Sequence, residues 1–302
     1  MVAHTPVPEV DLAAPRAPRP LGTGIWQPRQ PAFWLLAVMT AIGVALTVQM
    51  LSRADDPAIW GITLIGLAVE VVILGWIAFL LPSARVQPRS LRLGALFLGG
   101  VTALGIAAFL NSAFGSSLWQ YGLQSFEGSI TAPVSEDALR FTCLIGVLAL
   151  AATRRLSAMD GVVYGFLVGA GFELMENVTY SVRVDEAGEA LQSVISRMTM
   201  GFGLHALWTA VAGGALAYIW SRKQAGLSNR WWLLVPAYLL PMLMHMGWDA
   251  PSLSVIPIIK YIECAVLYAV SIAALVVVAR LARRDELQRY GVEVGGSAAI
   301  HT

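Results

Sequence analysis

Eight long apolar segments, separated by short polar connections, dominate the pattern of hydrophobic and polar positions along the chain. Each segment is close to the ~20 residues that a helix needs to cross the hydrocarbon core of a bilayer. The segments are too long and too continuously apolar for the alternating strands of a β-barrel, which have about ten residues each. The pattern therefore predicts an all-α, polytopic membrane helix bundle with about eight transmembrane helices. The predicted spans are 33–51, 58–81, 91–111, 133–152, 161–181, 197–220, 231–250 and 258–280.

Basic residues fall on alternate connections between these spans, and this alternation predicts the orientation. Lys and Arg accumulate on the cytoplasmic side of membrane proteins. The alternating clusters are Arg16, Arg19 and Arg29; Arg85, Arg89 and Arg92; Arg154 and Arg155; Arg222, Lys223 and Arg230; and Arg280, Arg283, Arg284 and Arg289. Both termini are therefore expected in the cytoplasm.

The two ends of the chain differ in composition from the apolar middle. Residues 1–31 are rich in proline and include scattered arginines, which is typical of a disordered tail rather than a signal peptide. Residues 283–302 are also expected to form a disordered cytoplasmic tail. The expected organisation is thus a single transmembrane domain over 32–282 between two tails.

Composition agrees with a protein of the cell membrane and excludes some partners. Of the 302 residues, 57% are hydrophobic and 13% are charged, whereas a soluble domain averages about 25% charged residues. The net charge of +1 argues against nucleic acid as a partner. The only two cysteines, Cys143 and Cys264, lie inside apolar segments and are expected to be buried free thiols.

The stretch GFELMENVTY places polar residues where a membrane span is expected to be apolar. Glu173, Glu176, Asn177 and Tyr180 follow the spacing i, i+3, i+4, i+7, so they share one face of a helix. A carboxylate that faces lipid costs at least a few kcal/mol. This face is therefore expected to look into the protein interior or into a wet cavity.

Other ionisable residues fall at the same predicted depth, near the outer ends of four spans. The candidate site residues are Glu136, Asp137, Arg140, Glu176, Asn177, His205, His245 and Asp249. Helix rise places them roughly 5–12 Å beneath the outer surface. One interpretation is structural, since polar side chains often form hydrogen bonds between membrane helices, and Arg140 could simply neutralise Glu136 one turn before it.

The residues at this depth would suit the activation of water. A glutamate could act as the general base, and a histidine or asparagine could donate to the oxyanion of a tetrahedral intermediate. Alternatively, Glu176, His205 and His245 could hold a divalent metal such as zinc. The chain contains no HExxH motif, so the strongest local signature of a zinc protease is missing.

Four short motifs, read in order over residues 131–250, resemble the PrsW family of intramembrane proteases, which is related to the CAAX prenyl protease and bacteriocin-processing superfamily. The motifs are APVSEDALR, DGVVYGFLVGAGFELMENVTY, HALWTAVAGGALA and HMGWD. The family pattern has an acid pair and a basic residue after Ala-Pro, then Phe-x-x-x-Glu-Asn, then His-Ala-x-x-Thr, then His-x-x-x-Asn or Asp.

The resemblance implies roles for the matching residues. Glu136 matches the first acid, which is the favoured activator of water. Asp137 stands where the family usually has a second Glu, and Arg140 stands where it usually has Lys. Glu176, Asn177, His205, His245 and Asp249 match the remaining functional positions, whereas Glu173 occupies a place that is commonly small.

The resemblance implies an intramembrane endopeptidase that cuts a single-pass membrane protein, such as an anti-sigma factor, near its extracytoplasmic face in regulated proteolysis. Two alternatives stay open. Buried acids and histidines also mark the pathways of ion- or proton-coupled transporters. A third hypothesis keeps the fold but makes the protein a non-catalytic sensor or scaffold. The oligomeric state is not predicted.

Overall fold

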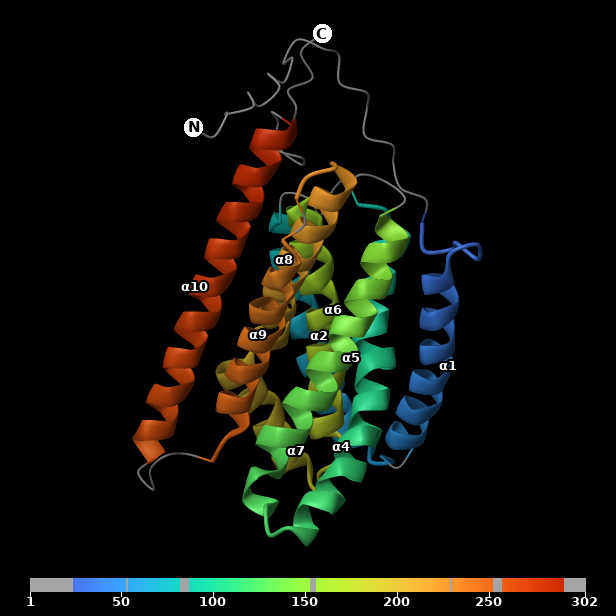
Figure 1. Cartoon of the computed structure of the whole chain (residues 1–302). Coiled ribbons are helices and arrows are strands. Elements are labelled where there is room, and N and C mark those ends of the chain that lie inside the picture. Colours follow the sequence, from blue (N-terminus) through green and yellow to red (C-terminus); the bar gives the residue numbers. More distant parts are fainter. Residues whose placement is uncertain are drawn as a thin grey trace.

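The protein is a bundle of long helices (Figure 1). The computed structural model describes residues 24–52, 54–81, 87–152, 156–228, 230–251 and 257–290, and these residues contain no strand. The helices are α1 (Pro31–Leu51), α2 (Pro57–Leu80), α3 (Arg89–Phe97), α4 (Leu104–Gln120), α5 (Glu127–Ala151), α6 (Ala158–Ser181), α7 (Ala187–Ser196), α8 (Leu204–Gln224), α9 (Leu234–Asp249) and α10 (Pro257–Tyr290).

Every predicted span coincides with a helix, although two pairs of helices form longer units. A π-helical turn over Leu98–Ala103 joins α3 to α4, and another over Arg197–Gly201 follows α7. Within the described residues, six helical stretches are long and apolar enough to cross a membrane: Pro31–Leu51, Pro57–Leu80, Arg89–Gln120, Ala158–Ser181, Ala187–Gln224 and Ile258–Asp285.

The helices α5 and α9 lie in the same bundle but are not among these six stretches. In α5, Glu136, Asp137 and Arg140 reduce the apolar character of the middle of the helix. The 16 residues of α9 rise only about 24 Å, which is less than the ~30 Å thickness of a hydrocarbon core. Both helices carry candidate site residues, and in α5 these residues themselves reduce the apolar character.

The chain ends differ in part from the sequence prediction. The last helix, α10, continues to Tyr290, so residues 283–290 are helical rather than part of a disordered tail. The rest of the expected C-terminal tail and most of the expected N-terminal tail lie outside the described residues.

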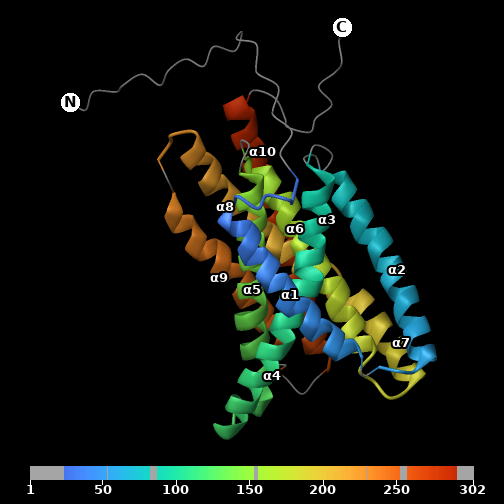
Figure 2. The same ribbon diagram turned by 90° about the vertical axis from the view of Figure 1, so that its right-hand side faces the viewer.

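The centre of the bundle is α6, which lies among the other helices in Figure 2 and packs more extensively against α8 than against any other helix. Nearly all of its 24 residues are buried. Gly161, Gly165 and Gly169 recur every four residues and form a stripe along the face that meets α8. A Cβ atom at Gly165 would collide with the carbonyl oxygen of Thr209, and one at Gly169 would collide with that of His205. The small residues therefore permit the close approach of the two backbones.

Replacing Gly169 by alanine is expected to destabilise the bundle, because the new methyl group would meet a backbone carbonyl that cannot move alone. Overpacking of this kind typically costs about 1–3 kcal/mol. Thermal unfolding of the purified protein in detergent measures the effect. The matched control is Gly75→Ala in α2, where nothing lies within 4 Å of the added Cβ. Equal unfolding midpoints for the two variants would contradict the packing argument.

The helical conformation is interrupted between α7 and α8, just before His205. Gly203 has φ of +80°, a left-handed conformation that favours glycine, and α8 begins at the next residue. The amide of Gly203 donates to the buried carboxylate of Glu173 on α6. Glu173, whose acidic side chain the sequence motif does not explain, thus ties the start of α8 to α6.

Candidate active site

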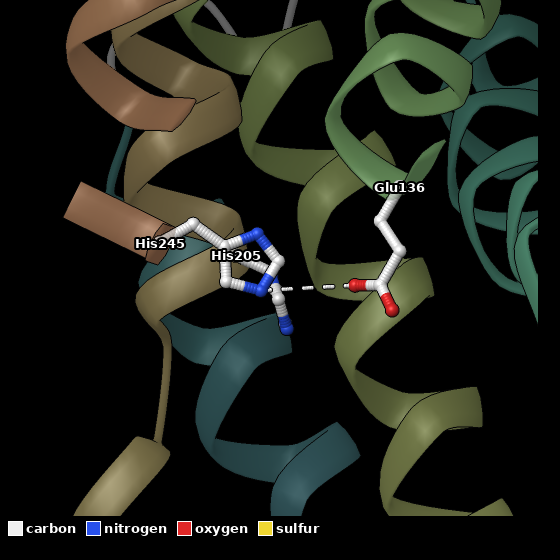
Figure 3. A group of neighbouring side chains, drawn as sticks. All are labelled: Glu136, His205 and His245. Carbon is white, nitrogen blue, oxygen red and sulfur yellow. Dashed lines mark ion pairs between the residues drawn. The ribbon is translucent and has the colours of Figure 1, made fainter. Parts of the chain in front are cut away.

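The expected site residues form one connected network at the meeting point of α5, α6, α8 and α9. Glu136, Asp137 and Arg140 come from α5, Glu176 and Asn177 from α6, His205 from the first turn of α8, and His245 and Asp249 from the last turns of α9. Seven of these eight residues are buried, and Asp249 lies at the edge. Figure 3 shows Glu136 pointing across to the imidazole of His245, with His205 beside it.

The two histidines share Arg140 and lie edge to face. Their ring centroids are 5.0 Å apart, and a guanidinium nitrogen of Arg140 lies 2.5 Å from Nδ1 of His205. A guanidinium group only donates, so Nδ1 of His205 accepts and its Nε2 carries the proton. That Nε2 lies 3.0 Å from a carboxylate oxygen of Glu176, to which it donates.

His245 has the opposite arrangement. Its Nδ1 lies 3.2 Å from Oδ2 of Asp137, a carboxylate that accepts the Nδ1 proton. Asp137 is itself ion-paired with Arg140. The suggestion that Arg140 neutralises Glu136 is therefore wrong in detail, because its carboxylate partner is Asp137. In the neutral tautomer with its proton on Nδ1, His245 would keep a lone pair on Nε2, the nitrogen that faces Oε2 of Glu136 and Oδ2 of Asp249.

Glu136 has one carboxylate oxygen bound and one without a hydrogen-bond partner. The side-chain amide of Asn111 on α4 donates to Oε1 at 2.9 Å. Oε2 is buried, has no hydrogen-bond partner among the described residues, and lies 3.8 Å from Nε2 of His245. Leaving a charged oxygen buried and unpaired is unfavourable, so this atom is available for a ligand.

Oε2 of Glu136, Oδ2 of Asp249 and Nε2 of neutral His245 are acceptors, and their convergence fits a cation. Oε2 of Glu136 and Oδ2 of Asp249 lie 3.8 and 3.2 Å from Nε2 of His245. One ligand atom each from Glu136, His205 and His245 lie within 4.8 Å of one another. Two imidazoles and a carboxylate form a ligand set that binds divalent metals such as zinc. The bond from Asp137 to Nδ1 of His245 also matches the usual support of a metal-binding histidine.

This triad differs from the expected metal set in one carboxylate. The sequence suggested Glu176 with His205 and His245, whereas the structure brings Glu136 together with the two histidines. The carboxylate of Glu176 is engaged by His205 and forms an ion pair with Arg197. Oε2 of Glu176 thus faces two donors, His205 and Arg197, whereas Oε2 of Glu136 has no hydrogen-bond partner among the described residues.

Behind Glu176, a chain of polar contacts reaches α2. Arg197 donates from Nε to the amide oxygen of Asn177 at 2.6 Å, and the nitrogen of that amide donates to Glu70 at 2.8 Å. Glu70 lies in the middle of α2 and is 2% exposed. The side chain of Asn177 therefore points away from the histidines and fixes Arg197 beside Glu176.

Replacing Glu70 by leucine is expected to destabilise the protein by about 1–3 kcal/mol, because the buried amide of Asn177 would lose its acceptor. The Glu70→Gln variant is the matched control, since its carbonyl oxygen can still accept from Asn177. Thermal unfolding in detergent compares the two variants. A leucine variant as stable as the glutamine variant would show that this hydrogen bond contributes little.

A small cavity opens beside the histidines. Its volume is ≈ 30 Å³ for water-sized molecules, and its lining includes Glu176, His205, Trp208, His245 and Asp249. About 10–15 Å³ is enough for one water molecule, so the cavity can admit water next to the ionisable groups. Half-exposed Tyr180 and partly exposed Arg197 also line it, so the cavity reaches residues that are open to the surroundings.

The candidate site residues did not include three contributors to the network. Asn111 and Arg197 contact site carboxylates, and Glu70 supports Asn177. A buried polar residue in an otherwise apolar helix was the available signal for Glu70 and Asn111. Their partners depend on how α2 and α4 rotate against α5 and α6, which the pattern of one helix does not specify. Cys143 and Cys264 are buried free thiols, as predicted.

A family model described as PrsW family intramembrane metalloprotease matches residues 87–279, which is more than half of the 302-residue chain. No curated protein and no solved structure matches the chain. The matched region contains every site residue named above except Glu70. The match agrees with the multiple apolar helices and with the buried Glu136, His205 and His245 triad. The chain therefore belongs to the PrsW family of intramembrane metalloproteases, and it is a multi-pass membrane peptidase that acts on membrane proteins within the bilayer.

Proposed function

We propose that this peptidase hydrolyses one peptide bond of a single-pass, membrane-anchored protein near the extracytoplasmic face, and that Glu136 activates the attacking water. The observation that carries the proposal is the free oxygen of Glu136. Oε2 is buried without a hydrogen-bond partner among the described residues and faces the imidazole of His245. Such an atom is ready to accept a proton from a water molecule bound in the site.

In this mechanism the water oxygen attacks the carbonyl carbon of the scissile bond, and one of its protons passes to Oε2 of Glu136. Glu136 then returns that proton to the leaving nitrogen as the C–N bond breaks. We assign His205 as the donor for the developing oxyanion; its Nε2 carries a proton, which would have to turn from Glu176 to the substrate. Arg140 and Asp137 hold the two imidazoles in their orientations.

As an alternative to direct activation of water by Glu136, we propose that Glu136, His205 and His245 hold zinc, because imidazole and carboxylate are its usual ligands in catalytic sites. With the metal held, Oε2 of Glu136 would be a ligand rather than the proton acceptor. When bound, a divalent metal polarises the substrate carbonyl and acidifies water. For His205 to act as a ligand, its contact with Glu176 would have to open, since Nε2 donates there in this arrangement. Asp249 could supply a further oxygen at the edge of the site.

We further propose that α5 and α9 also cross the membrane, which gives eight spans with both termini in the cytoplasm. The start of α1 and the end of α10 lie at the same end of the bundle (Figure 1). Glu136 lies in the first half of α5, and Glu176 and His245 lie in the last turns of α6 and α9, so the site is near the opposite end. Together with the basic connections, this favours cleavage on the extracytoplasmic side.

Cleavage on the extracytoplasmic side fits a site-1 type role, in which the substrate resembles a membrane-anchored anti-sigma factor. The test compares the membrane proteomes of cells that contain the wild-type protein or the Glu136→Gln variant. The expected result is one single-pass protein that is truncated only with the wild type. Glu189→Gln, which changes an exposed acid on α7, is the matched control and should behave as wild type. Identical proteomes would contradict the proposal.

A further inference from the structure

We propose that Asn111 on α4 is a positioning residue that holds the carboxylate of Glu136 in its reactive orientation; this inference rests on the proposed role of Glu136. Asn111 lies in none of the four motifs that connect the sequence to the family. Its side-chain nitrogen donates to Oε1 of Glu136 at 2.9 Å. With Oε1 bound in this way, Oε2 is the oxygen that faces His245.

The orientation of the Asn111 amide follows from its two neighbours. An ionised carboxylate only accepts, so the NH₂ group of Asn111 must face Glu136. The amide oxygen then faces the hydroxyl of Ser135, which donates to it and also lies 2.8 Å from the carbonyl oxygen of Thr131. Ser135 and Glu136 are adjacent in α5, so Asn111 spans two consecutive residues of that helix.

This contact fixes a side chain that few other groups restrain. Among the described residues, Glu136 accepts a side-chain hydrogen bond from Asn111, whereas Nε2 of His245 lies 3.8 Å away, beyond hydrogen-bond distance. A glutamate has three rotatable side-chain bonds, so without Asn111 its carboxylate would sample other rotamers. A site of this kind loses efficiency when a reactive group is displaced by about 1 Å.

Asn111 would also support the metal-binding arrangement. Residues that hydrogen-bond to metal ligands typically change metal affinity about 10–100-fold when they are replaced. Glu136 is the only carboxylate of the triad, and Asn111 is the residue that donates to it. The proposal therefore predicts an effect on metal binding that is measurable without any substrate.

The test compares Asn111→Ala and Asn111→Asp with the wild-type protein. The aspartate keeps the shape of asparagine but places an acceptor against Oε1 of Glu136. A packing role predicts that aspartate is the milder change, whereas a donor role predicts that it is the more harmful one. Ser112→Ala, at the exposed neighbouring position of α4, is the matched control.

We expect kcat to fall about 10–100-fold in both Asn111 variants, with the aspartate lower, while KM changes less than about twofold. Competition between the protein and a chromophoric chelator for Zn²⁺ alone should show an affinity about tenfold weaker. If Asn111→Asp does not accumulate, Asn111→Ala is compared with Ser135→Ala, which keeps the donor and is expected to lose less activity.

Wild-type kcat and Zn²⁺ affinity in Asn111→Ala, or an aspartate variant faster than the alanine variant, would overturn the inference. The Glu136→Gln variant distinguishes a failure of the proposed role of Glu136 from a failure of the positioning role of Asn111. If that variant still cleaves, the proposed role of Glu136 fails. If it is inactive while the Asn111 variants behave as wild type, only the positioning role of Asn111 fails.

Discussion

Replacing Glu136 by glutamine is expected to reduce cleavage of a membrane-anchored substrate by about 10²–10⁴-fold, the range that general-base catalysis contributes. Glutamine has nearly the same shape as glutamate, and its carbonyl oxygen can still accept from Asn111. Its NH₂ group, however, would take the place of Oε2 and cannot accept a proton from water. The measurement is the rate of product formation by purified protein in detergent micelles or liposomes.

The Glu136→Gln experiment needs proof that the variant folds. Its thermal unfolding midpoint should match that of the wild type, because a buried charge is replaced by a neutral group of equal volume. Glu189→Gln on α7 controls for the loss of one negative charge at an exposed position. Cleavage within about tenfold of the wild type would show that another group activates the water, since a lost base costs at least 10²-fold.

Much of the helical fold could be predicted from one sequence because it depends on patterns within single helices. Hydrophobic length predicted long helices, and the i, i+3, i+4 spacing predicted that Glu173, Glu176 and Asn177 share a face of α6. All three are buried in the structure. The high cost of a charge in lipid made the inward direction of these residues predictable.

The pairing of residues from different helices could not be predicted in the same way. Arg140 follows Glu136 by four residues and Asp137 by three, and both spacings allow a contact on a helix. The structure selects Asp137, which shares one guanidinium nitrogen of Arg140 with His245, while the other terminal nitrogen faces His205. That choice depends on where α8 and α9 bring their imidazoles, which is a property of the bundle rather than of α5.

The same reason explains the difference in the expected metal set. The sequence motifs indicate that Glu176, His205 and His245 are equally good candidates for metal ligands, because each is a metal-binding residue type near a helix end. Arg197, which ion-pairs with Glu176, lies in the π-helical turn between α7 and α8. Such a turn changes the direction of side chains from that of a continuous α-helix. The span predicted over 197–220 contained no signal of this turn.

Replacing His245 by alanine is expected to remove the metal and to lower cleavage by about 10³-fold, which corresponds to the several kcal/mol that a bound metal contributes. Its Nε2 faces the free oxygen of Glu136 and the carboxylate of Asp249, so its loss removes the nitrogen on which these acceptors converge. Elemental analysis of purified protein measures the metal content, and the cleavage rate is measured in parallel.

Asp249→Asn is the matched control for His245→Ala, because it changes a neighbour of the same nitrogen at the edge of the site. The Asp249 side chain is 29% exposed, so its replacement is expected to weaken metal binding by only about tenfold.

A wild-type protein that cleaves at full rate after complete removal of metal by a chelator would contradict the metal role of the triad. If the metal-free wild type were active and His245→Ala inactive, the role of His245 would be its hydrogen bond with Asp137 rather than metal binding. Glu136 would then activate water without a metal, and measuring metal content together with the cleavage rate distinguishes this result from a metal-dependent mechanism.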